Sequence, residues 1–135
     1  MYNTTASTTI GIRTGKNLNL YSDSSMAGPE VKRHCAVLGL KITHTVLKNN
    51  ELCLKAGNKR ILITQHISNS LFEHYTPDIV IVTGIHPEIE SGLRQPNAGL
   101  IIVSSGVSSK FHFPSHIQVD SIYYIASSGA IIKRI

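Results

Sequence analysis

Apolar and polar side chains alternate along the first part of the chain, in short segments separated by turns. Residues 8–13 (TTIGIR) and 17–21 (NLNLY) show this alternation and are joined by Thr14-Gly15-Lys16. A period of two is typical of a half-buried strand, and a short connection that contains glycine favours a hairpin. Residues 51–64 (ELCLKAGNKRILIT) repeat the pattern around Gly57-Asn58. The pattern therefore predicts two hairpins.

A helix is predicted between these hairpins, at residues 29–38 (PEVKRHCAVL). Pro29 fits the first helical position, and Glu30 is favourable at the positive end of the helix dipole. Gly39 is placed to end the helix. The next segment, residues 40–47 (LKITHTVL), alternates again and predicts a strand. The residues expected on one face of that strand are Leu40, Ile42, His44 and Val46.

The second half of the chain differs because its apolar runs are unbroken. Residues 78–84 (DIVIVTG) and 99–106 (GLIIVSSG) are typical of strands buried on both faces. Short helices are predicted at residues 70–75, before Pro77, and at residues 87–93, where a proline stands first. Residues 121–135 predict a terminal hairpin about Ser127-Ser128-Gly129.

Together these elements predict the α/β class. The expected architecture is a mixed β-sheet sandwich with helices, in which hairpins are followed by βαβ units. A chain of 135 residues without a linker or a repeat fits one core. Residues 1–135 are therefore predicted to form a single domain.

Composition adds a mild preference for polyanions. The chain has 13 Lys and Arg against 8 Asp and Glu, which gives a formal net charge of +5. The basic residues never form a run of more than two, so an ordinary solvated surface is the main interpretation. No apolar stretch reaches the roughly 18–20 residues that span a bilayer, so the chain is expected to be soluble. Cys35 and Cys53 are interpreted as buried free thiols.

Seven histidines are many for this length, and His66 ends an apolar run (RILITQHISN, residues 60–69). It is either a catalytic or metal-binding group or the polar cap of a strand. His112 and His116 are four residues apart, but Pro114 argues against the continuous helix that two ligands at this spacing need. The chain has no HxH or HExxH cluster, no G-x-S-x-G motif around Ser105 and no phosphate-binding loop. No cofactor is therefore predicted.

The order of the segments resembles the C-terminal soluble region of ComEC-type competence proteins, the membrane channels for DNA internalisation. The likeness rests on YNTTASTTIGI near the start, KAGNKRILIT in the centre, TPDIVIVTG, and DSIYYIASSGAIIKRI at the end. It implies a metallo-β-lactamase-like α/β sandwich. It also implies that the chain is the C-terminal domain of an inner or cytoplasmic membrane protein, with the transmembrane part of that protein as a partner. The side of the membrane that the domain faces does not follow from this chain.

The sequence departs from that family where its metal-binding members carry ligands. The H-x-H-x-D-H loop is absent. Thr64-Gln65-His66 stands where those members have TGD after the central strand, and HISNS (residues 66–70) stands where they have HHGS. A hydrolytic metal needs at least three protein ligands and an open position. The resemblance therefore implies a branch whose metal centre is lost.

The leading hypothesis is a non-catalytic domain with a structural or docking role, or with weak, sequence-independent contact to DNA. Its candidate phosphate contacts are Lys55, Lys59, Arg60, Lys110, Lys133 and Arg134. The alternative is a reduced metallo-hydrolase or nuclease, whose metal would be bound by His66, His74, His112 and His116, with Asp78 as a further ligand. A third interpretation, a protein-interaction domain, requires an exposed apolar patch or an unpaired edge strand.

Overall fold

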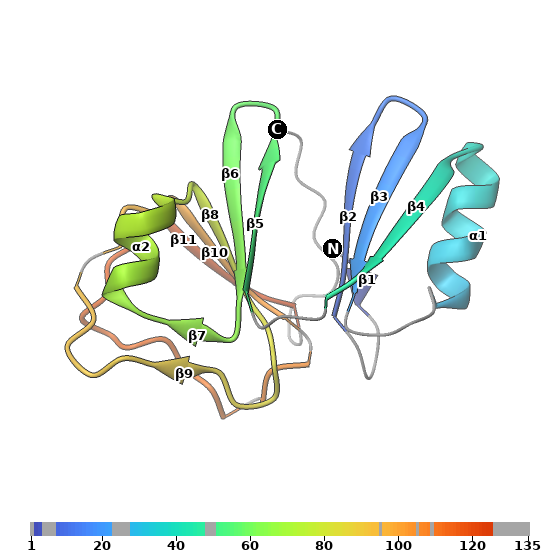
Figure 1. The fold of residues 1–135 in the computed structure, drawn as a ribbon. Coiled ribbons are helices and arrows are strands. Elements are labelled where there is room, and N and C mark those ends of the chain that lie inside the picture. Colours follow the sequence, from blue (N-terminus) through green and yellow to red (C-terminus); the bar gives the residue numbers. More distant parts are fainter. Residues whose placement is uncertain are drawn as a thin grey trace.

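Two β-sheets lie face to face, and one helix lies on the outer side of each (Figure 1). The structure is a computed structural model, and it describes residues 2–3, 8–22, 28–47, 51–94, 96–104, 106–108 and 110–125. The layers are helix, sheet, sheet and helix, which is an α/β arrangement with mixed sheets.

The first sheet contains four strands in the order β1-β2-β3-β4. Their bounds are β1 (Tyr2–Asn3), β2 (Thr8–Thr14), β3 (Asn17–Ser22) and β4 (Lys41–Val46). β2 and β3 form an antiparallel hairpin, and helix α1 (Pro29–Leu38) carries the chain to β4, which runs parallel to β3. Gly39 ends α1 at a φ of 59°, a left-handed conformation that glycine adopts without strain.

The second sheet contains five strands in the order β11-β10-β8-β6-β5. Their bounds are β5 (Glu51–Ala56), β6 (Lys59–Thr64), β8 (Ile79–Val82), β10 (Leu100–Val103) and β11 (Ser121–Tyr124). β5 and β6 form an antiparallel hairpin, and β6, β8, β10 and β11 are parallel. Helix α2 (Asn69–Tyr75) connects β6 to β8. Two short parallel strands, β7 (His66–Ile67) and β9 (Glu88–Ile89), form a third sheet.

The same order of elements occurs twice along the chain. A hairpin, a helix and a parallel strand appear as β2-β3-α1-β4 in the first sheet and as β5-β6-α2-β8 in the second, where the short strand β7 of the third sheet precedes the helix. In both units the strand after the helix pairs with the second strand of the hairpin. Both hairpins turn at a glycine with positive φ, Gly15 at 60° and Gly57 at 61°. The second sheet continues with β10 and β11, whereas β4 is the last strand of the first sheet in the described chain.

Three apolar layers hold these elements together. Between the sheets, Ile10 of β2 packs with isoleucines of the second sheet, which include Ile61, Ile63, Ile79, Ile81 and Ile102. On the outer side of the second sheet, the buried residues include Val80, Val82, Ile101 and Val103, with Phe72 of α2 packed against them. On the outer side of the first sheet, the layer is formed by Leu18, Leu20, Val31 and Cys35. β8 and β10 contact two of these layers, so all their residues are buried.

Most of the predicted elements are confirmed. Both hairpins, the helix at 29–38, the strand that follows it and the helix after residue 68 are present, and β8 and β10 are the two fully buried strands. The α/β class is confirmed as well. No helix in the described part of the chain is long and apolar enough to cross a membrane.

The helix predicted at residues 87–93 is wrong, because this segment contains strand β9 instead. Glu88 N donates to Gln65 O (2.9 Å) and Glu90 N donates to Ile67 O (2.9 Å), so its backbone groups pair with the chain around β7. Residues 121–124 of the predicted terminal hairpin form β11, which is parallel to β10. The rest of that hairpin, from residue 126 on, lies outside the described residues.

Candidate functional site

The carboxyl ends of the parallel strands β6, β8 and β10 meet at one edge of the second sheet, where open α/β sheets commonly bind ligands. A buried hydroxyl stands at each of these ends: Thr64 in β6, Thr83 after β8 and Ser104 after β10. The backbone ladder continues there, since Thr83 N donates to Thr64 O (2.9 Å) and Ser104 N donates to Val82 O (2.9 Å). We call this region the strand-end edge.

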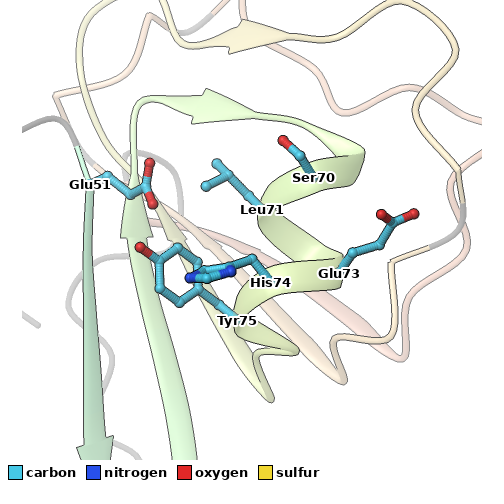
Figure 2. A pocket seen from close by; sticks show the side chains of 6 residues that line it. All are labelled: Glu51, Ser70, Leu71, Glu73, His74 and Tyr75. Carbon is cyan, nitrogen blue, oxygen red and sulfur yellow. The ribbon is translucent and has the colours of Figure 1, made fainter.

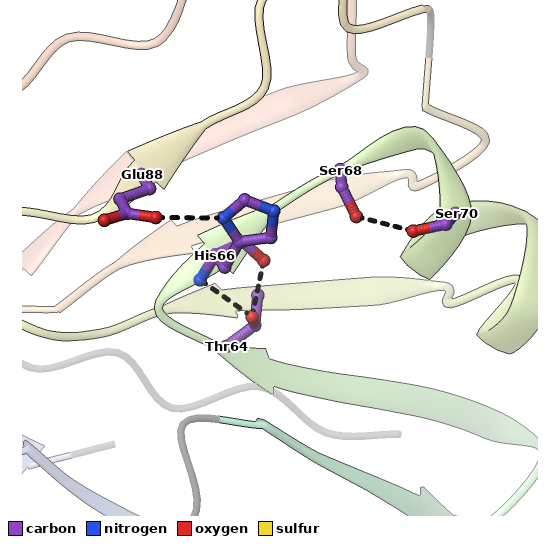
Figure 3. Close-up of polar contacts among 5 residues, drawn as sticks. All are labelled: Thr64, His66, Ser68, Ser70 and Glu88. Carbon is purple, nitrogen blue, oxygen red and sulfur yellow. Dashed lines mark hydrogen bonds and ion pairs between the residues drawn. The ribbon is translucent and has the colours of Figure 1, made fainter.

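His66 lies at the strand-end edge and is exposed (Figure 3). Its backbone N donates to Thr64 Oγ1 (3.0 Å), and Thr64 Oγ1 donates to His66 O (2.6 Å). Its Nδ1 is 3.4 Å from Glu88 Oε2, because the pairing of β7 with β9 sets the two residues side by side. His66 thus follows β6 after Gln65 and opens β7, with one exposed carboxylate as its side-chain partner.

Other polar groups at the strand-end edge already have partners within the protein. Ser104 Oγ lies 2.6 Å from Thr8 Oγ1 of the first sheet, and it accepts a hydrogen bond from Gly106 N (3.3 Å). The side chain of Gln65 lies over Gly84, where a Cβ would come within 3.0 Å of Gln65 Cδ. The Ser104 hydroxyl is therefore bonded within the protein, and it links the two sheets.

The strand-end edge does not fit a hydrolytic metal, because its buried groups are hydroxyls and His66 has a single carboxylate beside it. In residues that the structure describes, no three side chains of His, Cys, Asp or Glu gather as a metal ion requires. His74 is on α2, where its ring meets the ring of Tyr75 edge to face at 4.6 Å. His112 and His116 are exposed in the segment after β10. The four histidines of the metal hypothesis do not form a ligand group.

A shallow hollow of about 560 Å³ lies between α2 and the start of β5 (Figure 2). Its lining residues are Glu51, Ser70, Leu71, Glu73, His74 and Tyr75. The hydroxyl of Tyr75 is directed toward Glu51, and their hydrogen bond is the main reason that the pKa of Tyr75 lies above its ordinary value. Two carboxylates in an open hollow repel phosphate, so this surface does not suit nucleic acid.

Both hairpins turn at the end of the molecule opposite to the strand-end edge (Figure 1), and exposed basic residues flank both turns. Lys41 belongs to this end because its backbone N donates to Lys16 O in the first turn (2.8 Å). The exposed basic residues on these turns and strand ends are Arg13, Lys16, Lys41, Lys55, Lys59 and Arg60. We call these six residues the basic end.

Two carboxylates lie near the basic end, those of Asp78 and Asp120, and they precede β8 and β11. Asp78 accepts hydrogen bonds from Arg60 N (2.8 Å) and from Lys59 Nζ (3.1 Å). The bond from the Arg60 backbone, followed by that from Lys59, holds the pKa of Asp78 below its ordinary value. In the described residues Lys59 is the single member of the basic end with an ion pair, so a surplus of positive charge remains.

The structure brings together some of the predicted phosphate contacts and separates others. Lys55, Lys59 and Arg60 lie together at the basic end. Lys110 does not: its N donates to Ser108 Oγ (3.3 Å), and Ser108 N donates to Ile85 O (2.9 Å), close to the strand-end edge. The last two predicted contacts, Lys133 and Arg134, lie outside the described residues.

Three members of the basic end, Arg13, Lys16 and Lys41, are not among the sequence-predicted contacts. A signal was present, because basic residues flank the glycine turn of each hairpin. The packing of the two sheets is what brings the turns to one end of the molecule.

A scan of protein-family models, a search of curated proteins and a search of solved structures found no match to this chain.

Proposed function

We propose that this chain is a non-catalytic domain of a DNA-uptake membrane channel protein, and that it contacts DNA through the basic end. The observation that carries the proposal is the presence of six exposed basic side chains at one end of the molecule, near only two carboxylates in the described residues. Such a surface attracts phosphates and releases counterions from DNA. The resemblance of the chain to the soluble region of ComEC-type proteins supports DNA as the polyanion and the channel's transmembrane part as a second partner.

The contact in this proposal is independent of DNA sequence. Four of the six residues are lysines, which act as flexible point charges and lack the planar fork with which arginine recognises guanine. They lie on turns and strand ends, where their long side chains can reach phosphates at several positions along a DNA backbone. A small number of phosphate contacts without base contacts gives weak, salt-sensitive binding.

The domain is proposed to be non-catalytic because of the chemistry of the strand-end edge. A metal-dependent hydrolase needs three converging ligands and an open position. The strand ends here carry hydroxyls that are bonded within the protein, and a single His66–Glu88 pair. These groups support a structural role for this edge.

Fluorescence anisotropy with a labelled DNA duplex tests the role of the basic end. The triple variant Lys16→Gln, Lys41→Gln, Lys55→Gln is compared with Lys32→Gln, Arg33→Gln, Lys110→Gln, which removes the same charge from exposed residues elsewhere. We expect the first variant to lose about tenfold in affinity at low salt, and the slope of log K against log salt to fall in magnitude by about 2 to 3. Equal losses in both variants, or no binding by the wild-type chain, would contradict the proposal.

Metal analysis tests the absence of catalysis separately. The purified protein is incubated with excess Zn²⁺ or Mn²⁺, desalted and analysed for bound metal, and the same samples are incubated with DNA. We expect neither stoichiometric metal nor cleavage. A retained metal whose amount falls in His66→Ala would support the reduced metallo-hydrolase instead.

A further inference from the structure

An apolar strip is exposed at the free edge of the first sheet. β4 is the last strand of that sheet, and Ile42 and Val46 on it are 41% and 37% exposed. The end of α1 that leads into β4 adds Val37 and Leu38, which are 80% and 42% exposed. These are four of the five large hydrophobic side chains that are exposed in the described residues. Concentrated exposure of this kind marks an interaction surface.

The backbone of β4 is also ready to pair at this edge. Lys41 N and Leu47 N donate to Lys16 O (2.8 Å) and Ser22 O (2.7 Å), so the odd-numbered residues direct their backbone groups toward β3. Backbone groups of alternate residues in a strand point to opposite sides. Ile42, His44 and Val46 therefore direct their N–H and C=O groups away from β3, where the described chain provides no further strand.

The second of the two repeated units shows that the strand after the helix can pair with a further strand at its far edge. β8 occupies in the second unit the position that β4 occupies in the first, since each follows the helix and pairs with the second hairpin strand. The far edge of β8 is paired with β10. The equivalent edge of β4 is open in the described chain.

We propose that β4 pairs with β4 of a second copy of this chain, antiparallel and centred on His44. A two-fold axis perpendicular to the sheet makes a strand antiparallel to its own copy. In this register Ile42 lies opposite Val46 of the second copy, and His44 lies opposite His44. The three residues with outward backbone groups then face each other, and each opposed pair exchanges two hydrogen bonds.

Charge and side-chain matching favour a second copy over a charged peptide. From Lys41 to Val46 the strand contains one Lys and no Arg, Asp or Glu. The proposed register sets Lys41 opposite Leu47 and about 20 Å from Lys41 of the second copy, because the two lysines are offset by six residues. Of the other edge strands, β5 contains Glu51 and Lys55, and charges of this kind discourage edge pairing. β4 has no such protection at its centre.

The apolar end of α1 extends this match. Val37 and Leu38 lie beside the start of β4, and the antiparallel arrangement brings that end next to Val46 of the second copy. One strand and one helix end form an interface below the roughly 1,200 Å² of a standard complex. The dimer is therefore weak, and its population depends on protein concentration.

Sedimentation over a wide range of concentration tests the pairing with two matched double variants. Ile42→Lys with Val46→Lys opposes lysine to lysine across the two-fold axis, whereas Ile42→Lys with Val46→Glu opposes lysine to glutamate. Both pairs replace exposed residues, so both variants should fold. We expect the Lys/Lys variant to weaken dimerisation about tenfold or more, and the Lys/Glu variant to keep it. A wild-type chain that stays monomeric, or a Lys/Lys variant that dimerises like wild type, overturns the proposal.

Disulfide formation tests the register. At the two-fold axis the Cα atoms of residue 44 and its copy are about 5.5 Å apart, within the range of a disulfide. We expect His44→Cys to form reducible dimers under mild oxidation, and Lys41→Cys to form none beyond the background from Cys35 and Cys53 in wild type. Equal cross-linking of the two variants would exclude this register.

Discussion

The carboxylate of Asp78 holds two strand starts together. It precedes β8, and it accepts hydrogen bonds from the backbone N of Arg60 (2.8 Å) and from Lys59 Nζ (3.1 Å) at the start of β6. Asp78 also provides the backbone O that accepts from Gly99 N (3.1 Å) before β10. Three parallel strands thus begin around one residue, whose charge lies next to the basic end.

Asp78→Asn is expected to reduce stability in a pH-dependent way. The pKa of Asp78 is lowered in the folded protein, so its charge adds stability above the ordinary Asp pKa of about 3.9. That contribution disappears as the pH falls through the lower pKa of the folded state. The free energy of unfolding, measured by urea denaturation, should differ between variant and wild type at pH 5–7, and the difference should vanish as the pH falls below the lowered pKa of the folded state.

The matched control for this experiment is Asp120→Asn, which removes an exposed carboxylate before the neighbouring strand β11. We expect it to change the free energy of unfolding less than Asp78→Asn does. A constant difference between Asp78→Asn and wild type down to the lowest pH would contradict a role for the charge.

Among the elements, proline followed by glutamate at the start of a segment did not determine whether that segment formed a helix or a strand. Pro29-Glu30 opens helix α1, whereas Pro87-Glu88 leads into strand β9. The second segment reaches Gly92, which has a φ of 85°, after five residues, and helix nucleation is unfavourable over so short a length. Backbone pairing with β7 then determined the outcome. The starting residues were visible in the sequence, but the distant partner strand was not.

The N-terminus of α2 provides a test of local structure. Ser68 precedes the helix, is buried, and accepts a hydrogen bond from Leu71 N (3.4 Å). Its hydroxyl also contacts Ser70 Oγ at 3.0 Å (Figure 3). We expect Ser68→Ala to lower the free energy of unfolding by about 1 kcal/mol, because one helix N–H loses its acceptor.

Thermal or urea denaturation measures this effect, and Ser70→Ala is the control because Ser70 is exposed and does not cap the helix. A cost for Ser70→Ala as large as that for Ser68→Ala would show that the contact between the two hydroxyls, rather than the cap, stabilises α2.

At the scale of the whole molecule, the sequence predicted the class and the order of elements better than their partners. Alternation shows which residues of a strand share a face, as for Leu18 and Leu20. It does not show which sheet the strand joins, and the division between β4 and β5 was therefore not predicted. Because the sequence does not show how the two sheets pack, it did not show that the turns of both hairpins lie at one end. Lys55 and Arg60 were therefore identified as candidate phosphate contacts, whereas Arg13 and Lys16 were not.

The buried contact between Thr8 Oγ1 and Ser104 Oγ (2.6 Å) links the two sheets. We expect Thr8→Val and Ser104→Ala each to lower the free energy of unfolding by about 1–2 kcal/mol, since each leaves a buried hydroxyl without this partner. The double variant should cost less than the sum of the two, by about 1 kcal/mol. Urea denaturation of all four proteins measures this coupling, and strict additivity would show that the two hydroxyls do not act as a pair.

In the described residues the chain passes from the first sheet to the second only once, between β4 and β5. The strands of the first sheet thus all come from residues 2–46 and those of the second sheet from residues 51–124, and loop closure costs least for segments that are close in sequence. Each sheet can therefore form from its own stretch of chain, and the isoleucine faces of the two sheets can then dock. The order of the strands along the chain therefore favours a folding pathway in which the first sheet can form before the second sheet has been synthesised.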